Sequence, residues 1–141
     1  MKINQILLIE DDELDVISVR RSLSKLDKDY KLEIAYNGKE ALTMLKERQL
    51  QPDVILLDLN MPKMNGIEFL RILRKDEQLR NMKVFIMTTS AETADRVMTE
   101  SLGVSGYIIK PLNYTDNTKR SDSMDAFVQF HLRKILAEEN G

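Results

Sequence analysis

The chain has 141 residues, the length of one ordinary domain, and its 43% hydrophobic and 31% charged residues exclude a disordered or fibrous chain. A net charge of -2 provides no positive field for nucleic acid, so we expect no nucleic-acid partner. The absence of cysteine excludes disulfides and thiolate sites, and no apolar run could cross a membrane. We therefore expect a single cytoplasmic domain over residues 1–141 without a membrane partner.

Strand-like and helix-like segments alternate along the chain. Short apolar runs without polar alternation predict buried strands at Ile6–Ile9, Leu32–Ala35, Val54–Leu57, Val84–Met87 and Tyr107–Ile109. The second run is the weakest and suits an edge strand. Apolar residues that share one helix face predict the intervening and final helices: Val16, Val19, Leu23 and Leu26; Ala41, Met44 and Leu45; Phe69, Ile72 and Leu73; Ala94, Val97, Met98 and Leu102; and Met124, Phe127, Val128, His131, Leu132 and Ile135.

This alternation predicts an α/β fold, in which a five-stranded parallel sheet carries helices on both faces. Ligands of such sandwiches bind outside the carboxyl ends of the strands. The polar, turn-prone stretch from Asn113 to Ser123 predicts a loop before the last helix. Functional residues are therefore expected where the strands end.

Four of the five predicted strands end in chemically active residues. They are Glu10, Asp11 and Asp12 after the first strand, Asp58 at the third, Thr88, Thr89 and Ser90 at the fourth, and Lys110 at the fifth. Because the ends of parallel strands meet at one edge, these side chains are expected to converge. The convergence indicates a site more strongly than any single residue does.

The predicted metal ligands are Asp11, Asp12 and Asp58. Neighbouring carboxylates repel one another unless a cation neutralises them, and Mg²⁺ prefers oxygen ligands of this kind. The one histidine, His131, falls on the apolar face of the last helix, where we expect it to pack in the core or an interface and not to bind metal. Asp12 has an alternative role as a helix N-cap, with Asp15 three residues later.

Asp58 is the candidate nucleophile, because it ends the strongest apolar run and precedes a turn-rich loop. A carboxylate can accept a phosphoryl group as an acyl phosphate when a metal and cations neutralise the charge. Lys110 supplies such a cation, and the Thr88 hydroxyl and Thr89 amide can donate hydrogen bonds to phosphoryl oxygens. These four residues form the predicted catalytic group.

From Gln5 to Leu112 the sequence resembles the receiver domain of two-component response regulators. The family's acidic pair resembles Asp11 and Asp12, its phosphoacceptor Asp58, its switch threonine Thr88 and its lysine Lys110. The loop after Asp58 and the Thr88-Thr89-Ser90 segment are similar to stand-alone receivers that serve bacterial phytochrome kinases.

The resemblance implies a flavodoxin-like (βα)5 fold with strand order 2-1-3-4-5 and a regulator that catalyses only its own phosphorylation and dephosphorylation. A sensor histidine kinase or phosphotransfer protein would phosphorylate Asp58, and the signal would pass to an unknown downstream protein. The main-chain carbonyl of Asn60 would help to bind Mg²⁺, and Tyr107 would be the switch aromatic. A homodimer through the fourth helix, fifth strand and fifth helix is also implied.

Two other classes of protein fit part of the pattern. A phosphatase of the haloacid dehalogenase type also uses an aspartate, Mg²⁺ and a lysine, but it usually needs a second acid where this chain has Asn60. An adaptor or a flavodoxin-like cofactor binder would work without phosphorylation. The intact acid set argues against the adaptor, and the acidic segment Glu10–Glu13 would repel the phosphate of a cofactor.

Overall fold

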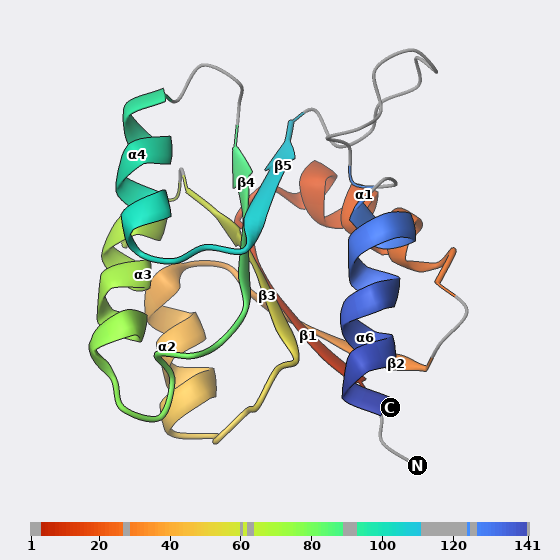
Figure 1. Ribbon diagram of the computed structural model, residues 1–141, viewed down its shortest axis with the longest axis horizontal. Helices are drawn as coiled ribbons and strands as arrows, with labels where there is room; N and C mark the ends of the chain where they lie inside the picture. Colours follow the sequence, from red (N-terminus) through yellow and green to blue (C-terminus); the bar gives the residue numbers. More distant parts are fainter. Residues whose placement is uncertain are drawn as a thin grey trace.

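The chain forms a parallel sheet with helices on both faces (Figure 1). The structure, a computed structural model, describes residues 4–26, 29–59, 61, 64–88, 93–110, 124 and 127–140, without the side chains of 93–96, 130 and 137–140. Its five strands have the order β2-β1-β3-β4-β5. The predicted α/β class and the flavodoxin-like strand order are confirmed.

All five predicted runs form strands, and each neighbouring pair is parallel. The strands are β1 (Asn4–Ile9), β2 (Tyr30–Ala35), β3 (Val54–Asp58), β4 (Val84–Thr88) and β5 (Gly106–Ile109). β2 lies at one edge, as predicted, and β5 at the other. Every residue of β3 and β4 is buried, because these inner strands are covered on both faces.

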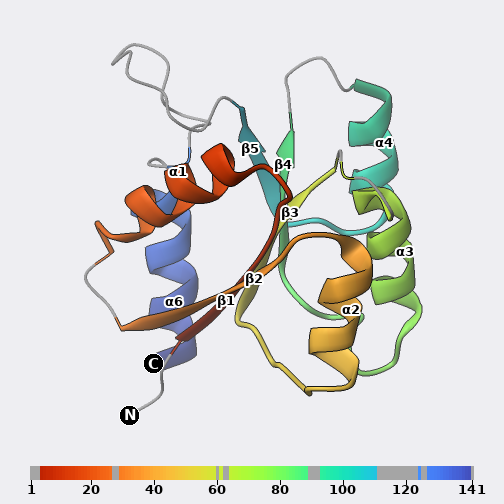
Figure 2. The same ribbon diagram turned by 180° about the vertical axis from the view of Figure 1, so that it is seen from behind.

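The helices divide into two layers (Figures 1 and 2). One face of the sheet carries α1 (Glu13–Leu23), the π-helical segment η1 (Phe127–Leu132) and α6 (Arg133–Asn140); the other carries α2 (Gly38–Lys46), α3 (Gly66–Lys75) and α4 (Thr93–Ser101). Within the described residues, no helix has both the length and the apolar character needed to cross a membrane. The predicted loop from Asn113 to Ser123 lies outside those residues.

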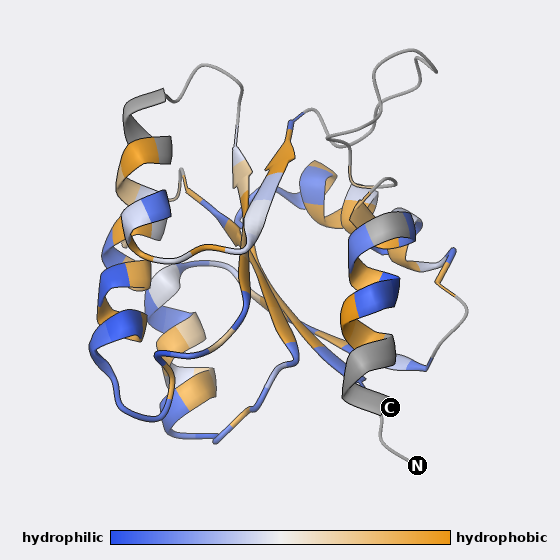
Figure 3. Ribbon diagram, in the orientation of Figure 1, coloured by the Kyte–Doolittle hydropathy of each residue, from blue (hydrophilic) through white to orange (hydrophobic). Residues whose placement is uncertain are grey.

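The sheet separates two hydrophobic cores, because alternate strand residues point to opposite faces. In β1, Ile6 and Leu8 pack into the core shared with α1 and the C-terminal helix. Leu7 and Ile9 pack into the core shared with α2 and α3. Figure 3 shows the same division, since the most hydrophobic residues lie on the strands and on the sheet-facing sides of the helices.

The C-terminal helical segment packs largely as its apolar face predicts. Phe127 and Val128 are buried, and the Phe127 ring meets the Phe85 ring of β4 edge to face with centroids 4.7 Å apart. His131 is exposed, although its ring centroid lies 6.3 Å from that of Phe127. His131 is therefore outside the core, and a role for it in an interface stays a prediction.

The start of α3 fixes the backbone at the end of β3. Asn65 caps the helix, and its side-chain oxygen accepts the N–H of Glu68 at 2.9 Å. The first helical residue is Gly66, where a Cβ would lie 2.7 Å from Leu59 Cα and 2.8 Å from the Asp58 carbonyl oxygen. Only glycine allows this close approach of the helix to the strand end.

Gly66→Ala should lower the free energy of unfolding by about 2 kcal/mol or more, because the added methyl group would force two backbone segments apart. Gly38→Ala is the matched control. Gly38 also begins a helix after an asparagine cap, but its Cβ would first meet the movable Met64 side chain, at 3.0 Å. This control should lose less than about 1 kcal/mol. Urea unfolding measures both losses, and equal values would contradict the backbone contact.

Candidate functional site

The carboxyl ends of the inner strands and β5 meet at one edge of the sheet. The register pairs Asp58 with Met87 and Thr88 with Ile109, so β3, β4 and β5 end side by side. The next residue after β5, Lys110, donates its backbone N–H to the Thr88 carbonyl at 2.8 Å. In Figure 1 this edge is at the top, where the arrowheads of β4 and β5 point. The predicted convergence is therefore present in the fold.

Asp58 is buried at the end of the central strand β3, with 2% of its surface exposed. Its strand is paired with β1 on one side and β4 on the other. The following residue, Leu59, accepts the N–H of Gly66 at 3.0 Å, which ties the strand end to α3. Asp58 is thus held in one orientation by both the sheet and the next helix.

Asp58 belongs to a cluster of three carboxylates. One oxygen each from Glu10, Asp11 and Asp58 lies within 4.8 Å of the other two. Glu10 and Asp58 are buried and Asp11 is exposed, so the cluster is open to solvent on one side. Oxygen donors at this spacing fit a hard divalent cation such as Mg²⁺. The structure therefore brings together Asp11 and Asp58, two of the three predicted side-chain ligands.

Asp12 lies next to this cluster but is not among its three described members. Its carboxylate caps α1, and Oδ1 accepts the Leu14 N–H at 2.9 Å, which is the alternative role that the sequence left open. The backbone N–H of Asp12 donates to Glu10 Oε1 at 3.1 Å. The metal role of Asp12 stays a prediction, while Glu10 occupies the place beside Asp11.

Glu10 was expected among the strand-end residues, but the sequence assigned it neither a metal nor a catalytic role. Its backbone N–H donates to the Ala35 carbonyl at 3.0 Å, which extends the hydrogen bonding between β1 and β2 by one residue. Glu10 is buried as a result. Burial raises the pKa of Glu10 to about 8, and the neighbouring Asp58 carboxylate adds to the rise, while Lys110 opposes it. Without a metal, the site therefore favours the neutral form of Glu10 more than water does.

The ammonium group of Lys110 lies among three carboxylates. Its Nζ is 2.8 Å from Asp15 Oδ2, 3.1 Å from Glu10 Oε2 and 3.4 Å from Asp58 Oδ1. Burial alone would lower the pKa of Lys110, but the carboxylates outweigh burial and raise this pKa above its ordinary value. Lys110 therefore remains charged at neutral pH and reaches Asp58, as the sequence predicted.

Thr88 lies on β4, the neighbour of β3, and Tyr107 lies on β5, the edge strand beyond β4. Thr88 is buried at the end of β4. Tyr107 of β5 is half-buried, and its hydroxyl lies 2.7 Å from Oγ1 of Thr99, a buried residue of α4. This contact connects the predicted switch aromatic to α4. Two other predicted site residues, Asn60 and Thr89, lie outside the described residues.

The raised pKa of Glu10 predicts how the stability of the metal-free protein depends on pH. Ionisation is harder in the folded chain, so the free energy of unfolding should fall as pH rises from 4.5 toward about 8. Relative to Glu10→Gln, wild type should lose about 1 to 3 kcal/mol over that range, because one pKa unit is worth about 1.4 kcal/mol and relaxation around the ionised carboxylate reduces the full cost. Urea unfolding in chelator at pH 5 and pH 8 measures this difference. A constant difference between the two proteins would contradict the buried, ionisable Glu10.

Comparisons with known proteins agree with this arrangement. A family model described as the response regulator receiver domain matches residues 6–121. Response regulator Rcp1 of Synechocystis sp. is 32% identical over 127 residues, which are 86% of this chain and 86% of Rcp1. The similarity therefore extends over most of both proteins.

Solved structures lead to the same family. The Mn²⁺-bound form of Rcp1 has a TM-score of 0.79 and 29% identity, covering 90% of this chain and 93% of that one. A two-component response regulator from Legionella pneumophila has a TM-score of 0.75 and 39% identity, covering 94% and 99%. The phosphorylated cyanobacterial phytochrome response regulator RcpA has a TM-score of 0.75 and 26% identity, covering 99% and 93%. With its strand-end acids and lysine in place, the chain belongs to the response regulator receiver domain family.

Proposed function

We propose that Asp58 is the phosphoacceptor of this receiver domain and that its phosphorylation requires Mg²⁺. Receiver domains act as phosphoacceptor regulators in two-component signalling, with a histidine kinase as partner, and are not classical enzymes. The observation that carries the proposal is the position of Lys110 Nζ, 3.4 Å from Asp58 Oδ1, beside a cluster of three carboxylates. A phosphotransfer protein would serve equally well as the donor.

In the proposed transfer, a carboxylate oxygen of Asp58 attacks the phosphorus of a phosphohistidine. The oxygen–phosphorus bond forms, the phosphorus–nitrogen bond breaks, and its electron pair returns to the imidazole. Lys110 offsets the negative charge on the transferring group, and the Thr88 hydroxyl and the Thr89 amide donate hydrogen bonds to its oxygens. The chain thus supplies the nucleophile, one cation and two donors.

A divalent metal fits the carboxylate cluster of Glu10, Asp11 and Asp58, and Rcp1 has been solved with Mn²⁺ bound. We propose Mg²⁺ as the cation for this chain, because Mg²⁺ commonly binds through one or two carboxylates together with phosphate oxygens. The main-chain carbonyl of Asn60 is proposed as a further ligand. When bound, the cation neutralises charge on the carboxylates and on the transferring phosphoryl group. Asp12, whose carboxylate caps α1, is proposed as a further residue of this site.

Phosphorylation of Asp58 is proposed to move Thr88 and Tyr107. A phosphoryl group adds about two negative charges and new acceptors, which attract the Thr88 hydroxyl. The Tyr107 hydroxyl is 2.7 Å from Thr99, so a turn of this ring further inward would alter the packing of α4. A full reversal of a two-state switch needs about 5 kcal/mol, which a few charge-assisted hydrogen bonds can provide.

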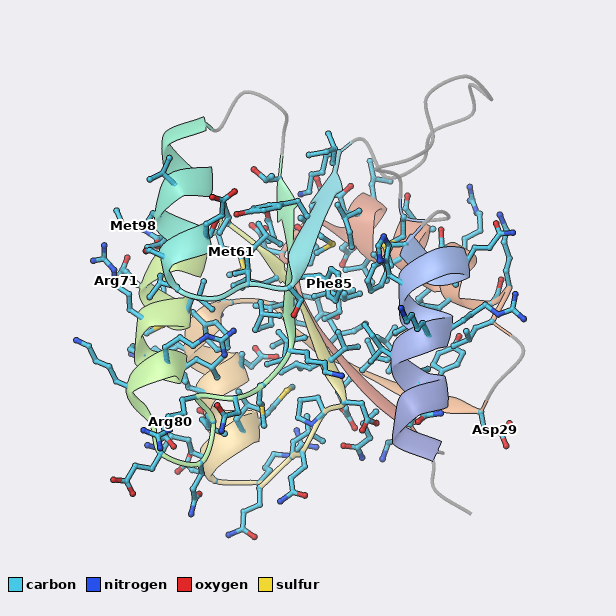
Figure 4. The ribbon with its side chains drawn as sticks, in the orientation of Figure 1. Asp29, Met61, Arg71, Arg80, Phe85 and Met98 are labelled. Atoms are coloured by element: carbon cyan, nitrogen blue, oxygen red, sulfur yellow. The ribbon has the colours of Figure 1, made fainter. Side chains whose placement is uncertain are left out.

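The proposed output surface comprises α4, β5 and the C-terminal helix. α4 exposes Val97 and Met98, which have 69% and 39% of their surfaces accessible. Figure 4 shows Met98 on the outer side of α4, close to Arg71 of α3, whose Nη2 lies 2.9 Å from Met98 Sδ. This surface is suited to a downstream protein or a second copy of the chain. The similarity to phytochrome response regulators suggests a phytochrome-type sensor kinase as the partner upstream.

Asp58→Asn should abolish the response to beryllofluoride, a phosphoryl mimic that needs the Asp58 carboxylate and Mg²⁺. In wild type, Mg²⁺ with beryllofluoride should shift the amide NMR resonances of Thr88 and Tyr107. Asp29→Asn is the control, because Asp29 undergoes the same chemical change at the opposite end of the sheet (Figure 4). This control should respond like wild type, and an equal response in Asp58→Asn would refute the phosphoacceptor assignment.

Asp11→Asn should weaken Mg²⁺ binding at least about tenfold, because it removes one charge from the carboxylate cluster. Asp12→Asn is the neighbouring comparison, since asparagine caps a helix as well as aspartate does. If Asp12 acts mainly as the cap, this variant should keep Mg²⁺ affinity within about twofold. Calorimetric titration measures both affinities. Equal losses of Mg²⁺ affinity in the two variants would show that Asp12 is also a ligand. They would contradict the view that Asp11 binds the metal while Asp12 mainly caps α1.

A further inference from the structure

The shortest polar contact of the Lys110 ammonium is with Asp15 on α1, and not with Asp58. The Asp15 contact is 2.8 Å, whereas the Asp58 contact is 3.4 Å. The side chains of Lys110 and Asp15 have only 18% and 20% of their surfaces exposed, so bulk water weakens their interaction less than that of a surface pair. The contact links the first helix to the end of the fifth strand.

Asp15 does not take the helix-capping role that its position in the sequence suggests. Three residues after an N-cap, an acidic side chain can complete a capping box. Here the backbone N–H of the cap, Asp12, donates to Glu10 Oε1, and the described partner of the Asp15 carboxylate is Lys110. The acid therefore belongs to the site and not only to the start of α1.

The surroundings of Lys110 match the number of hydrogen bonds that its ammonium group can donate. An ammonium group has three donors. Three carboxylates surround this one, from Glu10, Asp15 and Asp58. Of these, Glu10 and Asp58 belong to the carboxylate cluster, whereas Asp15 stands outside it. A phosphoryl group on Asp58 would thus meet a lysine whose charge is already shared with an outside acid.

We propose that Asp15 is a positioning residue that holds Lys110 and competes with the phosphoryl group for its positive charge. The proposal rests on the assignment of Asp58 as the phosphoacceptor. Asp15 would keep Lys110 in place before transfer and would weaken its hold on the phosphoryl group afterward. The residue would therefore limit how strongly the phosphorylated state is favoured.

Neutralising Asp15 should tighten anion binding without tightening cation binding. With Asp15→Asn, beryllofluoride at saturating Mg²⁺ should bind roughly three- to tenfold more tightly, because one negative charge beside the anion is gone. Mg²⁺ alone should bind no more tightly than to wild type, because Lys110 then turns more fully to Glu10 and Asp58. A variant that merely disturbed the fold would bind both beryllofluoride and Mg²⁺ more weakly.

Two controls complete the experiment. Glu13→Gln removes the same charge from an exposed position on the same helix turn and should leave both affinities near those of wild type. Asp15→Glu keeps the charge and should restore beryllofluoride affinity toward the wild-type value. Unfolding curves confirm that each variant is folded, and Asp15→Ser replaces Asp15→Asn if the amide is not tolerated.

The outcomes separate this proposal from the assignment of Asp58. If wild type fails to bind beryllofluoride, the phosphoacceptor assignment is wrong. If wild type binds but Asp15→Asn binds with equal or lower affinity, Asp15 does not compete for Lys110 and the present proposal is overturned. If Glu13→Gln tightens binding as much as Asp15→Asn, the effect is one of general charge, and the positioning role is likewise overturned.

Discussion

Repulsion among the carboxylates of Glu10, Asp11 and Asp58 is the constraint around which this site is arranged. Their oxygens lie within 4.8 Å of one another, and two of the three residues are buried. Two features reduce the repulsion: the pKa of Glu10 is raised, which favours its neutral form, and Lys110 lies against the group. The cluster remains suited to a divalent cation, which would neutralise the negative charge of the carboxylates when bound.

The fold makes this unfavourable arrangement tolerable because the strand ends cannot move apart. β1 and β3 are inner strands, covered by a hydrophobic core on each face. Gly66 brings α3 against the backbone of Asp58 and Leu59, which fixes the loop after β3 from outside the sheet. The stability of two cores thus supports a local concentration of charge that would not persist in a flexible loop.

The sequence predicted the fold almost completely, since five apolar runs and the helical spacings between them leave few arrangements of a parallel sheet. Asp58 and Lys110 were also predictable, because a charged residue that directly ends a buried strand has its position fixed by the sheet. The environment of His131 was predicted less well. Periodicity puts it on the apolar face, but the π-helical segment that contains it has a wider turn, and the side chain is exposed.

The acids around α1 show where sequence reasoning stops. Glu10, Asp11 and Asp12 are consecutive and chemically alike, so the pattern alone does not tell which of them caps a helix and which face the cluster. That choice depends on where the ladder between β1 and β2 ends, which backbone hydrogen bonding determines. Asp15 was missed for a related reason, because its contact with Lys110 joins residues 95 positions apart in the chain.

The most direct test of this account is to locate the phosphoryl group chemically. The protein would be incubated with Mg²⁺ and acetyl phosphate, reduced with borohydride, which converts an aspartyl phosphate to homoserine, and mapped by peptide mass spectrometry. We expect homoserine at position 58 alone, with none when the metal is removed by a chelator. Reduction at another aspartate, or labelling at position 58 that is independent of metal, would contradict the account.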